Sequence, residues 1–170
     1  NIFSPIFDRF PIKIDNQIGN FGRNDSISNF YTDVGIFSSI ICYESIYGEY
    51  VSKFVKKGAN WITIITNDGW WGDSYGYSQH FAYSRLRALE NRKFLVRSAN
   101  TGISAVINPF GEILDSLSYN KSGIINTNIY KNSKITFYTM YGDYVARISI
   151  LLSLVYFINF FLNFKKKKLN

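Results

Sequence analysis

The 170-residue sequence is poorest in the residues from which disulfides and metal sites are built. It contains one cysteine, Cys42, and one histidine, His80. A single cysteine forms no disulfide within the chain, so the cysteine content does not indicate a redox compartment. One thiol and one imidazole also fall short of the four ligands of a structural zinc site, and we expect no metal and no cofactor.

Negative charge is scarce as well, with 12 Asp and Glu residues against 19 Lys and Arg residues. Four of the lysines form a run at 165–168, and they account for more than half of the net charge of +7. A nucleic-acid site requires a basic patch on the folded part of a protein rather than a basic tail. The charge therefore predicts no nucleic-acid partner.

Charge is missing altogether from residues 148–164, which read ISILLSLVYFINFFLNF. As a helix this run is roughly 25 Å long against a hydrocarbon core of about 30 Å, and snorkelling lysines can close the difference. A buried C-terminal helix is the alternative, but a terminal helix of that kind normally keeps a polar face. We predict a transmembrane helix over 146–164 and a basic cytoplasmic tail over 165–170. The folded domain would then lie on the opposite side of the membrane from this tail.

The remainder alternates between strand-like and helix-like segments. GIFSSIIC at 35–42 and NWITIIT at 60–66 are short apolar runs, typical of buried strands. Between them, apolar residues recur at helical spacing from Glu44 onward, and Gly58 can end that helix. A strand, a helix and a strand within about thirty residues predict a βαβ unit and an α/β fold.

A loop rich in Gly and Asp follows at 67–80, and we expect Ser78 to cap the next helix. Beyond that helix, apolar segments predict further strands at 93–100, 102–108, 112–117 and 123–129. Residues 1–34 are rich in Asn, Asp, Ser and Gly and are expected to be mostly loop. We therefore divide the chain into a loop-rich region at 1–34, the main α/β domain at 35–145 and the membrane segment.

Cys42 stands where the first predicted strand gives way to the predicted helix. A thiol has a reference pKa near 8.5, so a nucleophilic cysteine needs a base or a positive charge close by. The free N–H groups at the start of the following helix can supply positive potential. Two interpretations stay open, a nucleophile or a small buried apolar residue. His80 could pair with Cys42, although packing or a hydrogen bond at a helix start is the simpler interpretation.

Five further residues are candidates for a site around this cysteine. Glu44 could orient a substrate amine or the loop, or it could be an exposed acid at a helix start. Trp70 and Trp71 could line an acyl pocket or face the membrane interface, or they could pack within their loop, with one of them facing outward. Asn67 and Asp68 belong to the site or simply form the turn.

Four segments together resemble the apolipoprotein N-acyltransferases, a family of membrane enzymes in the nitrilase superfamily. They read ICYESIYGEYV, GANWITIITNDGWWGDSYGYSQH, RLRALENRKFLVRSANTGISAVINPFGEIL and TFYTMYGDY, and they occur in the family's order. The resemblance covers residues 36–164, including the apolar tail. It implies that 35–145 is part of a nitrilase-like αββα sandwich, the catalytic domain, followed by a transmembrane helix.

The resemblance also implies a reaction. Cys42 matches the family's acyl-accepting nucleophile, and Tyr43 and Glu44 match the residues beside it. In the family, the cysteine attacks an ester of a phospholipid, forms a thioester and passes the acyl group to the N-terminal amine of a diacylglyceryl-cysteine apolipoprotein. The implied partners are a phospholipid donor, an apolipoprotein acceptor and the bacterial inner membrane, with the catalytic domain in the periplasm.

One feature of the family is missing from this sequence. The family uses a Glu–Lys–Cys triad, in which Glu is the general base and Lys stabilises the oxyanion. Its Glu and Lys lie well upstream of the cysteine, no such segment occurs here, and Lys13 has the wrong neighbours. We expect a C-terminal fragment of a longer enzyme, inactive alone, or a degenerate gene. A soluble nitrilase-like amidase and a non-catalytic membrane-anchored domain are the alternative functions.

Overall fold

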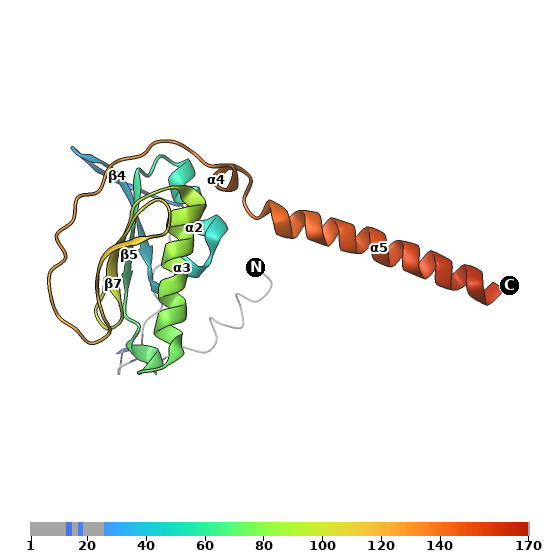
Figure 1. Ribbon diagram of the computed structural model, residues 1–170, viewed down its shortest axis with the longest axis horizontal. Helices are drawn as coiled ribbons and strands as arrows, with labels where there is room; N and C mark the ends of the chain where they lie inside the picture. Colours follow the sequence, from blue (N-terminus) through green and yellow to red (C-terminus); the bar gives the residue numbers. More distant parts are fainter. Residues whose placement is uncertain (1–12, 15–16, 19–25, 170) are drawn as a thin grey trace.

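The computed structural model describes residues 13–14, 17–18 and 26–169 (Figure 1). Its main sheet is built from six strands: β3 (Phe30–Thr32), β4 (Gly35–Ile41), β5 (Trp61–Thr66), β6 (Leu95–Ala99), β7 (Ser104–Ile107) and β8 (Ile113–Leu117). The strands lie side by side in that order. The central three, β4, β5 and β6, are parallel, and β3, β7 and β8 are added antiparallel. The sheet is therefore mixed, with a parallel centre.

Two helices cover one face of this sheet (Figure 1). Helix α2 (Gly48–Lys56) connects β4 to β5, and α3 (Tyr75–Asn91) connects β5 to β6. Because each pair of connected strands is parallel, each connection is a βαβ unit. The βαβ unit predicted from the sequence is thus confirmed, and its parallel strands end at the same edge of the sheet.

The hydrophobic core lies between the sheet and these helices. Ile40, Ile62 and Ile64 alternate along β4 and β5 with less buried residues, and all three are fully buried in the core. On the opposite face, Ile41 and Ile65 are 63% and 58% exposed. The alternation follows from the strand period of two, which sends successive side chains to opposite faces.

One sheet with helices on one face is half of the predicted αββα sandwich. Within the described ranges, the only other sheet pairs the two-residue strands β1 (Lys13–Ile14) and β2 (Gln17–Ile18). The exposed apolar face of the main sheet is the side on which a second layer would pack in such a sandwich.

The starts of both helices differ from the predictions. The helix expected from Glu44 begins at Gly48, because residues Cys42–Ile46 first form the 3₁₀ helix η1. The prediction of Ser78 as the cap of α3 was wrong, since the Ser74 hydroxyl accepts the hydrogen bond from the N–H of the second helical residue. Ser78 lies inside the first turn and donates to a main-chain carbonyl there. The loop before α3 is therefore shorter than predicted.

The segment predicted as a strand at 123–129 has no regular structure, so that prediction was wrong. Its apolar residues do not reach the core, and Ile124 is 93% exposed. Side chains rather than a strand ladder hold the chain beyond it. Buried Lys93 donates hydrogen bonds to the carbonyls of Asn132 and Lys134. The apolar pattern did not predict the structure here, because no neighbouring strand pairs with this segment and its side chains do not pack in the hydrophobic core.

Lys93 gives the fold a testable pH dependence. Burial lowers the pKa of Lys93 to about 8, whereas an unfolded lysine titrates near 10.4. Between these values the unfolded chain binds more protons, so the free energy of unfolding should rise with pH from about 8 to about 10. Lys93→Met should remove this contribution, and exposed Lys121→Met should keep it. Denaturant unfolding followed by tryptophan fluorescence in detergent measures both, and equal slopes in the two variants would contradict the assignment.

The chain continues through the short helix α4 (Phe137–Tyr141) into α5 (Tyr144–Leu169), which projects away from the domain (Figure 1). Residues Tyr144–Leu162 have a mean hydropathy of 2.0, and none of this stretch is buried against the rest of the protein. Nineteen helical residues measure about 28 Å, close to a hydrocarbon core of about 30 Å. The predicted apolar helix is present and is long enough to span a membrane.

Candidate active site

Cys42 occupies a strained turn at the end of β4. Its φ is +50°, one of three positive values among the described residues other than glycine. A side chain held in such a backbone conformation costs roughly 1–3 kcal/mol, and such residues cluster at functional sites. The cysteine is free and half-buried. A small buried filler needs no such turn, so the geometry favours the interpretation of Cys42 as a nucleophile.

Glu44 holds the same turn from the side of the strand. One carboxylate oxygen accepts the Ile41 N–H at 2.8 Å, and the other accepts the Tyr50 hydroxyl at 3.2 Å. Burial, and then the charge of Glu44, raise the pKa of Tyr50, which keeps that hydroxyl protonated as a donor. Both oxygens are therefore engaged with the protein, which supports loop orientation as the role of Glu44.

Behind the turn lies a buried cluster that joins three elements. Asp68 follows β5, His80 is on α3 and Arg97 is on β6, and all three are at most 3% exposed. Asp68 Oδ2 accepts from Arg97 Nη2 at 2.6 Å, and Asp68 Oδ1 lies 2.8 Å from His80 Nδ1. Thr66 also donates its hydroxyl to Asp68, at 2.9 Å. The cluster thus pins the loop after β5 to the helix and to the neighbouring strand.

The charges in this cluster favour an ionised Asp68. Burial alone would raise the pKa of Asp68, but the hydrogen bond with His80 and the charge of Arg97 outweigh it and lower that pKa. Burial lowers the pKa of Arg97, while the charges of Asp68 and, more weakly, of a Cys42 thiolate oppose that decrease. Arg97 is therefore a buried positive charge paired with Asp68, and its Nη2 lies 3.1 Å from His80 Nδ1.

The cluster contacts the main chain of Cys42. His80 Nε2 lies 3.2 Å from the Cys42 carbonyl oxygen and 2.9 Å from Ser45 Oγ. The Ser45 hydroxyl lies 2.8 Å from the same carbonyl oxygen and can donate to it. His80 therefore does hydrogen-bond near a helix start, as the simpler interpretation predicted, and the turn of Cys42 is its partner. Among the described residues, none forms a hydrogen bond with the thiol itself.

Two of the three aromatic candidates lie beside the imidazole of this cluster. Trp70 is 72% exposed, whereas the Trp71 ring lies 5.3 Å from the His80 ring, so one tryptophan faces outward as predicted. Tyr43 is half-exposed, with its ring 6.2 Å from that of His80. Trp71 and Tyr43 therefore both border the imidazole, and Trp70 does not.

The two polar candidates of the loop after β5 have different roles. Asn67 accepts a main-chain N–H two residues on and behaves as a turn residue. Asp68, by contrast, is far more than a turn residue, because it is the centre of the buried cluster. In this structure Asn67 stabilises the turn, and Asp68 joins the loop to α3 and β6 through the buried cluster.

Sequence reasoning missed Arg97, Ser45 and Thr66. Arg97 carried a signal, because a charged residue within the apolar segment KFLVRSAN must find a buried partner if the strand is central. The partner is 29 residues away in sequence, and no local pattern joins the two. Among the described residues, no group of three His, Cys, Asp or Glu side chains could hold a metal ion.

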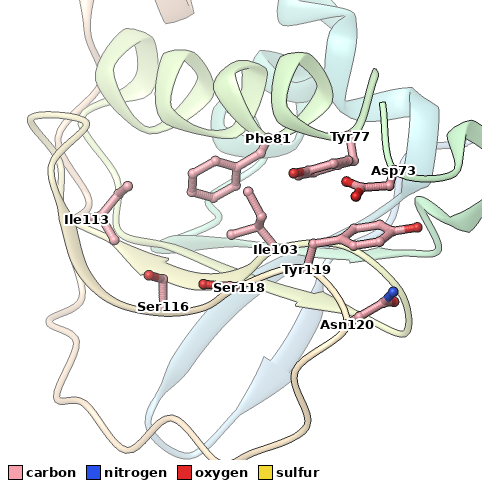
Figure 2. A pocket seen from close by; sticks show the side chains of 9 residues that line it. All are labelled: Asp73, Tyr77, Phe81, Ile103, Ile113, Ser116, Ser118, Tyr119 and Asn120. Carbon is pink, nitrogen blue, oxygen red and sulfur yellow. The ribbon is translucent and has the colours of Figure 1, made fainter. Parts of the chain in front are cut away.

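Two hollows lie near these elements. One, of about 380 Å³, is beside the Cys42 turn and is lined by Glu44, Tyr47, Glu49 and Tyr50. The other, of about 590 Å³, lies between α3 and the β7–β8 side of the sheet (Figure 2). Its apolar part is formed by Phe81, Ile103 and Ile113. None of the predicted site residues lines this second hollow.

Comparisons with known proteins agree with this architecture. The carbon–nitrogen hydrolase family profile matches residues 3–133. A protein named apolipoprotein N-acyltransferase from Chlorobaculum tepidum is 38% identical over 132 residues, which are 76% of this chain and 25% of that protein. Its namesake from Wigglesworthia glossinidia brevipalpis is 37% identical over 144 residues, 84% of this chain and 28% of that protein. The chain thus spans about a quarter of the length of these curated relatives.

A solved structure shows the same fold at lower identity. It is a mutant of the amidase from Nesterenkonia sp. AN1, with acrylamide added at the active-site cysteine by Michael addition. The match has a TM-score of 0.52 and 19% identity, and it covers 65% of this chain and 45% of the amidase chain. This similarity confirms the predicted nitrilase-like α/β fold.

Proposed function

Because the chain belongs to the carbon–nitrogen hydrolase family, we propose that it carries the nucleophile of a membrane-bound N-acyltransferase. The observation that carries the proposal is the strained, half-buried Cys42 at the end of β4, with its turn held by Glu44 on one side and by His80 on the other. The names of the curated relatives and the apolar helix α5 support a lipid substrate rather than a soluble amide.

The proposed reaction has two halves. The Cys42 thiolate attacks the ester carbonyl of a phospholipid, forming a carbon–sulfur bond, and the lysophospholipid leaves as an alkoxide that takes up the proton lost by the thiol. The N-terminal amine of a diacylglyceryl-cysteine apolipoprotein then attacks the thioester. An amide bond forms, the carbon–sulfur bond breaks, and the amine proton returns to the thiolate. Each half forms and breaks one bond at the acyl carbon.

The base and the oxyanion donor come, in this proposal, from a Glu and a Lys that are not among these 170 residues. A missing base costs about two to four powers of ten in rate, and one missing oxyanion donor about two to three. The 170 residues are therefore proposed to be inactive unless the rest of such an enzyme is joined to them.

The alternative function is that of an amidase, which a protein of the same fold has. A direct assay separates acyl transfer from amide hydrolysis. The assay uses the whole protein encoded by the gene that contains these 170 residues. This protein is purified in detergent and given a phospholipid with a labelled acyl chain, together with a diacylglyceryl-cysteine peptide. We expect label on the peptide amine. A parallel reaction with small aliphatic amides should release no ammonia above background. Amide hydrolysis without acyl transfer would favour the amidase.

The orientation of α5 leads to a prediction about topology. Positive residues collect on the cytoplasmic side of membrane proteins, and four lysines follow the apolar stretch directly. We propose that the protein lies in the bacterial inner membrane, with Cys42 in the periplasm and the C-terminus in the cytoplasm. A periplasm-dependent alkaline phosphatase fused after Asn170 should be silent, and a cytoplasm-dependent reporter at the same point should be active. The opposite pattern would reverse the orientation.

The two tryptophans should respond differently to substitution. We propose that exposed Trp70 touches acyl chains or the bilayer interface, where indoles are favoured. Trp70→Ala should therefore reduce acyl transfer with little change in melting temperature. Trp71→Ala is the matched control, because this ring packs on His80 and its loss should lower the melting temperature. A larger stability loss from Trp70→Ala than from Trp71→Ala would contradict this division.

A further inference from the structure

His80 presents a buried imidazole for which the proposed reaction has no acid–base use. It is 3% exposed, and its Nε2 faces the Cys42 carbonyl oxygen and Ser45 Oγ at 3.2 and 2.9 Å. We propose that His80 is a positioning residue, which aims the Cys42 thiol by holding the turn that carries it. The inference rests on the proposed function of Cys42 as the nucleophile.

The turn needs such a support. A residue with a side chain keeps a positive φ only when its surroundings over-determine that conformation, and φ of Cys42 is +50°. Three contacts hold this conformation, one on the strand side of the turn and two at the Cys42 carbonyl. Glu44 accepts the N–H of the preceding residue at 2.8 Å, while Ser45 and His80 lie against the Cys42 carbonyl. The carbonyl side is enclosed, since Ser45 is 0% exposed.

The imidazole is itself fixed from behind. Nδ1 lies 2.8 Å from Asp68 Oδ1 and 3.1 Å from Arg97 Nη2. Because an ionised carboxylate only accepts and Asp68 is the nearer of the two groups, we assign a proton to Nδ1, donated to Asp68. Arg97 Nη2 donates to the other carboxylate oxygen at 2.6 Å, and Nη1 and Nε of the same guanidinium donate to Ser84 Oγ and to the Ile103 carbonyl. The position of Nε2 is therefore set by a chain of buried hydrogen bonds that ends on β6.

Nε2 is tied to the turn whether or not it carries a proton. With a proton, it donates to the Cys42 carbonyl oxygen or to Ser45 Oγ. Without one, it accepts the Ser45 hydroxyl, and Ser45 belongs to the same 3₁₀ helix as Cys42. In both states the imidazole links Asp68 on one side to the Cys42 turn on the other.

Two variants separate positioning of Cys42 from simple anchoring of Asp68. His80→Gln can place its amide near the position of Nε2, toward the Cys42 turn, and gives up the Asp68 contact. His80→Asn can place its amide near the position of Nδ1, toward Asp68, and gives up the contact with the turn. Positioning requires the glutamine variant to be the more active. A purely structural role of the Asp68–His80 contact requires the asparagine variant to be at least as active.

The experiment uses the protein encoded by the gene, in detergent, with two readouts. The first is the rate at which iodoacetamide alkylates Cys42, followed by peptide mass spectrometry. The second is thioester formation from phospholipid, followed by transfer to a diacylglyceryl-cysteine peptide, and this turnover gives kcat and KM. A misplaced reacting group can cost about 100-fold, so kcat of His80→Asn should fall about 100-fold and that of His80→Gln less than about 10-fold. KM for phospholipid should not change in either variant, because His80 is only 3% exposed and the proposal gives it no contact with the lipid.

Equal or higher activity of His80→Asn, or a rise in KM in place of a fall in kcat, would overturn the inference. Should either variant fail to fold, Ser45→Ala tests the same link, since it removes the bridging hydroxyl and leaves the Asp68 contact intact. It should slow alkylation of Cys42, and an unchanged rate would also overturn the inference. Alkylation needs no lipid, so absence of a thioester in the wild-type protein would refute the proposed function without deciding the role of His80.

Discussion

Cys42→Ala should abolish acyl transfer by the protein encoded by the gene. Removing the nucleophile of an enzyme that works through a covalent intermediate lowers kcat by about 10⁶-fold, because the remaining groups act only on that intermediate. Cys42→Ser should be nearly as inactive, since a hydroxyl is a far weaker nucleophile than a thiolate unless a base is tuned for it. Transfer of a labelled acyl chain to a diacylglyceryl-cysteine peptide measures both variants.

Cys42→Gly provides the control for the fold. Glycine adopts a positive φ without strain, so this variant should melt at or above the temperature of the wild-type protein while remaining inactive. Loss of activity together with an unchanged or raised melting temperature assigns the effect to the thiol. Full turnover by either Cys42→Ala or Cys42→Gly would show that another group accepts the acyl chain.

Asp68→Ala should produce the largest loss of stability. Asp68 and Arg97 form an ion pair at 2.6 Å with both side chains fully buried. Removing one partner of such a pair leaves an uncompensated buried charge and typically costs about 3–5 kcal/mol. The free energy of unfolding, measured by denaturant titration in detergent, should fall by that amount. Asp68→Asn should cost less, because the amide oxygen can still accept from Arg97.

The matched control is a second ion pair with the same separation and a different environment. Glu49 and Arg147 also approach to 2.6 Å, but their side chains are 47% and 62% exposed. Exposed pairs contribute about 0–1 kcal/mol, so Glu49→Ala should have a small effect. Similar losses from Asp68→Ala and Glu49→Ala would contradict the view that the buried cluster stabilises the site.

Local sequence patterns predicted the scaffold well. The apolar runs of β4 and β5 and the helical spacing between them identified a βαβ unit, because strand and helix periodicities depend on nearby residues alone. The same reasoning placed Cys42 at a strand end. It could not foresee the positive φ of Cys42, because that conformation is supported by a side chain on α3 that lies 38 residues away.

The predictions that failed depended on the environment of a segment. An apolar pattern at 123–129 suggested a strand, yet no neighbouring strand edge or core receives it. For Asp68 the choice between a site residue and a turn residue stayed open, because its partners, His80 and Arg97, follow 12 and 29 positions later. Contacts over such separations are set by the packing of helices on the sheet, which no short window of sequence contains.

The central claim is that Cys42 becomes covalently acylated, and one measurement tests it directly. The protein encoded by the gene is incubated with phospholipid in the absence of any acceptor, then digested and examined by mass spectrometry. The account predicts a peptide whose Cys42 carries the mass of one acyl chain, removed by neutral hydroxylamine as a thioester should be. Unmodified Cys42 in protein that transfers acyl chains to an acceptor, or an acyl group on a different residue, would contradict the account.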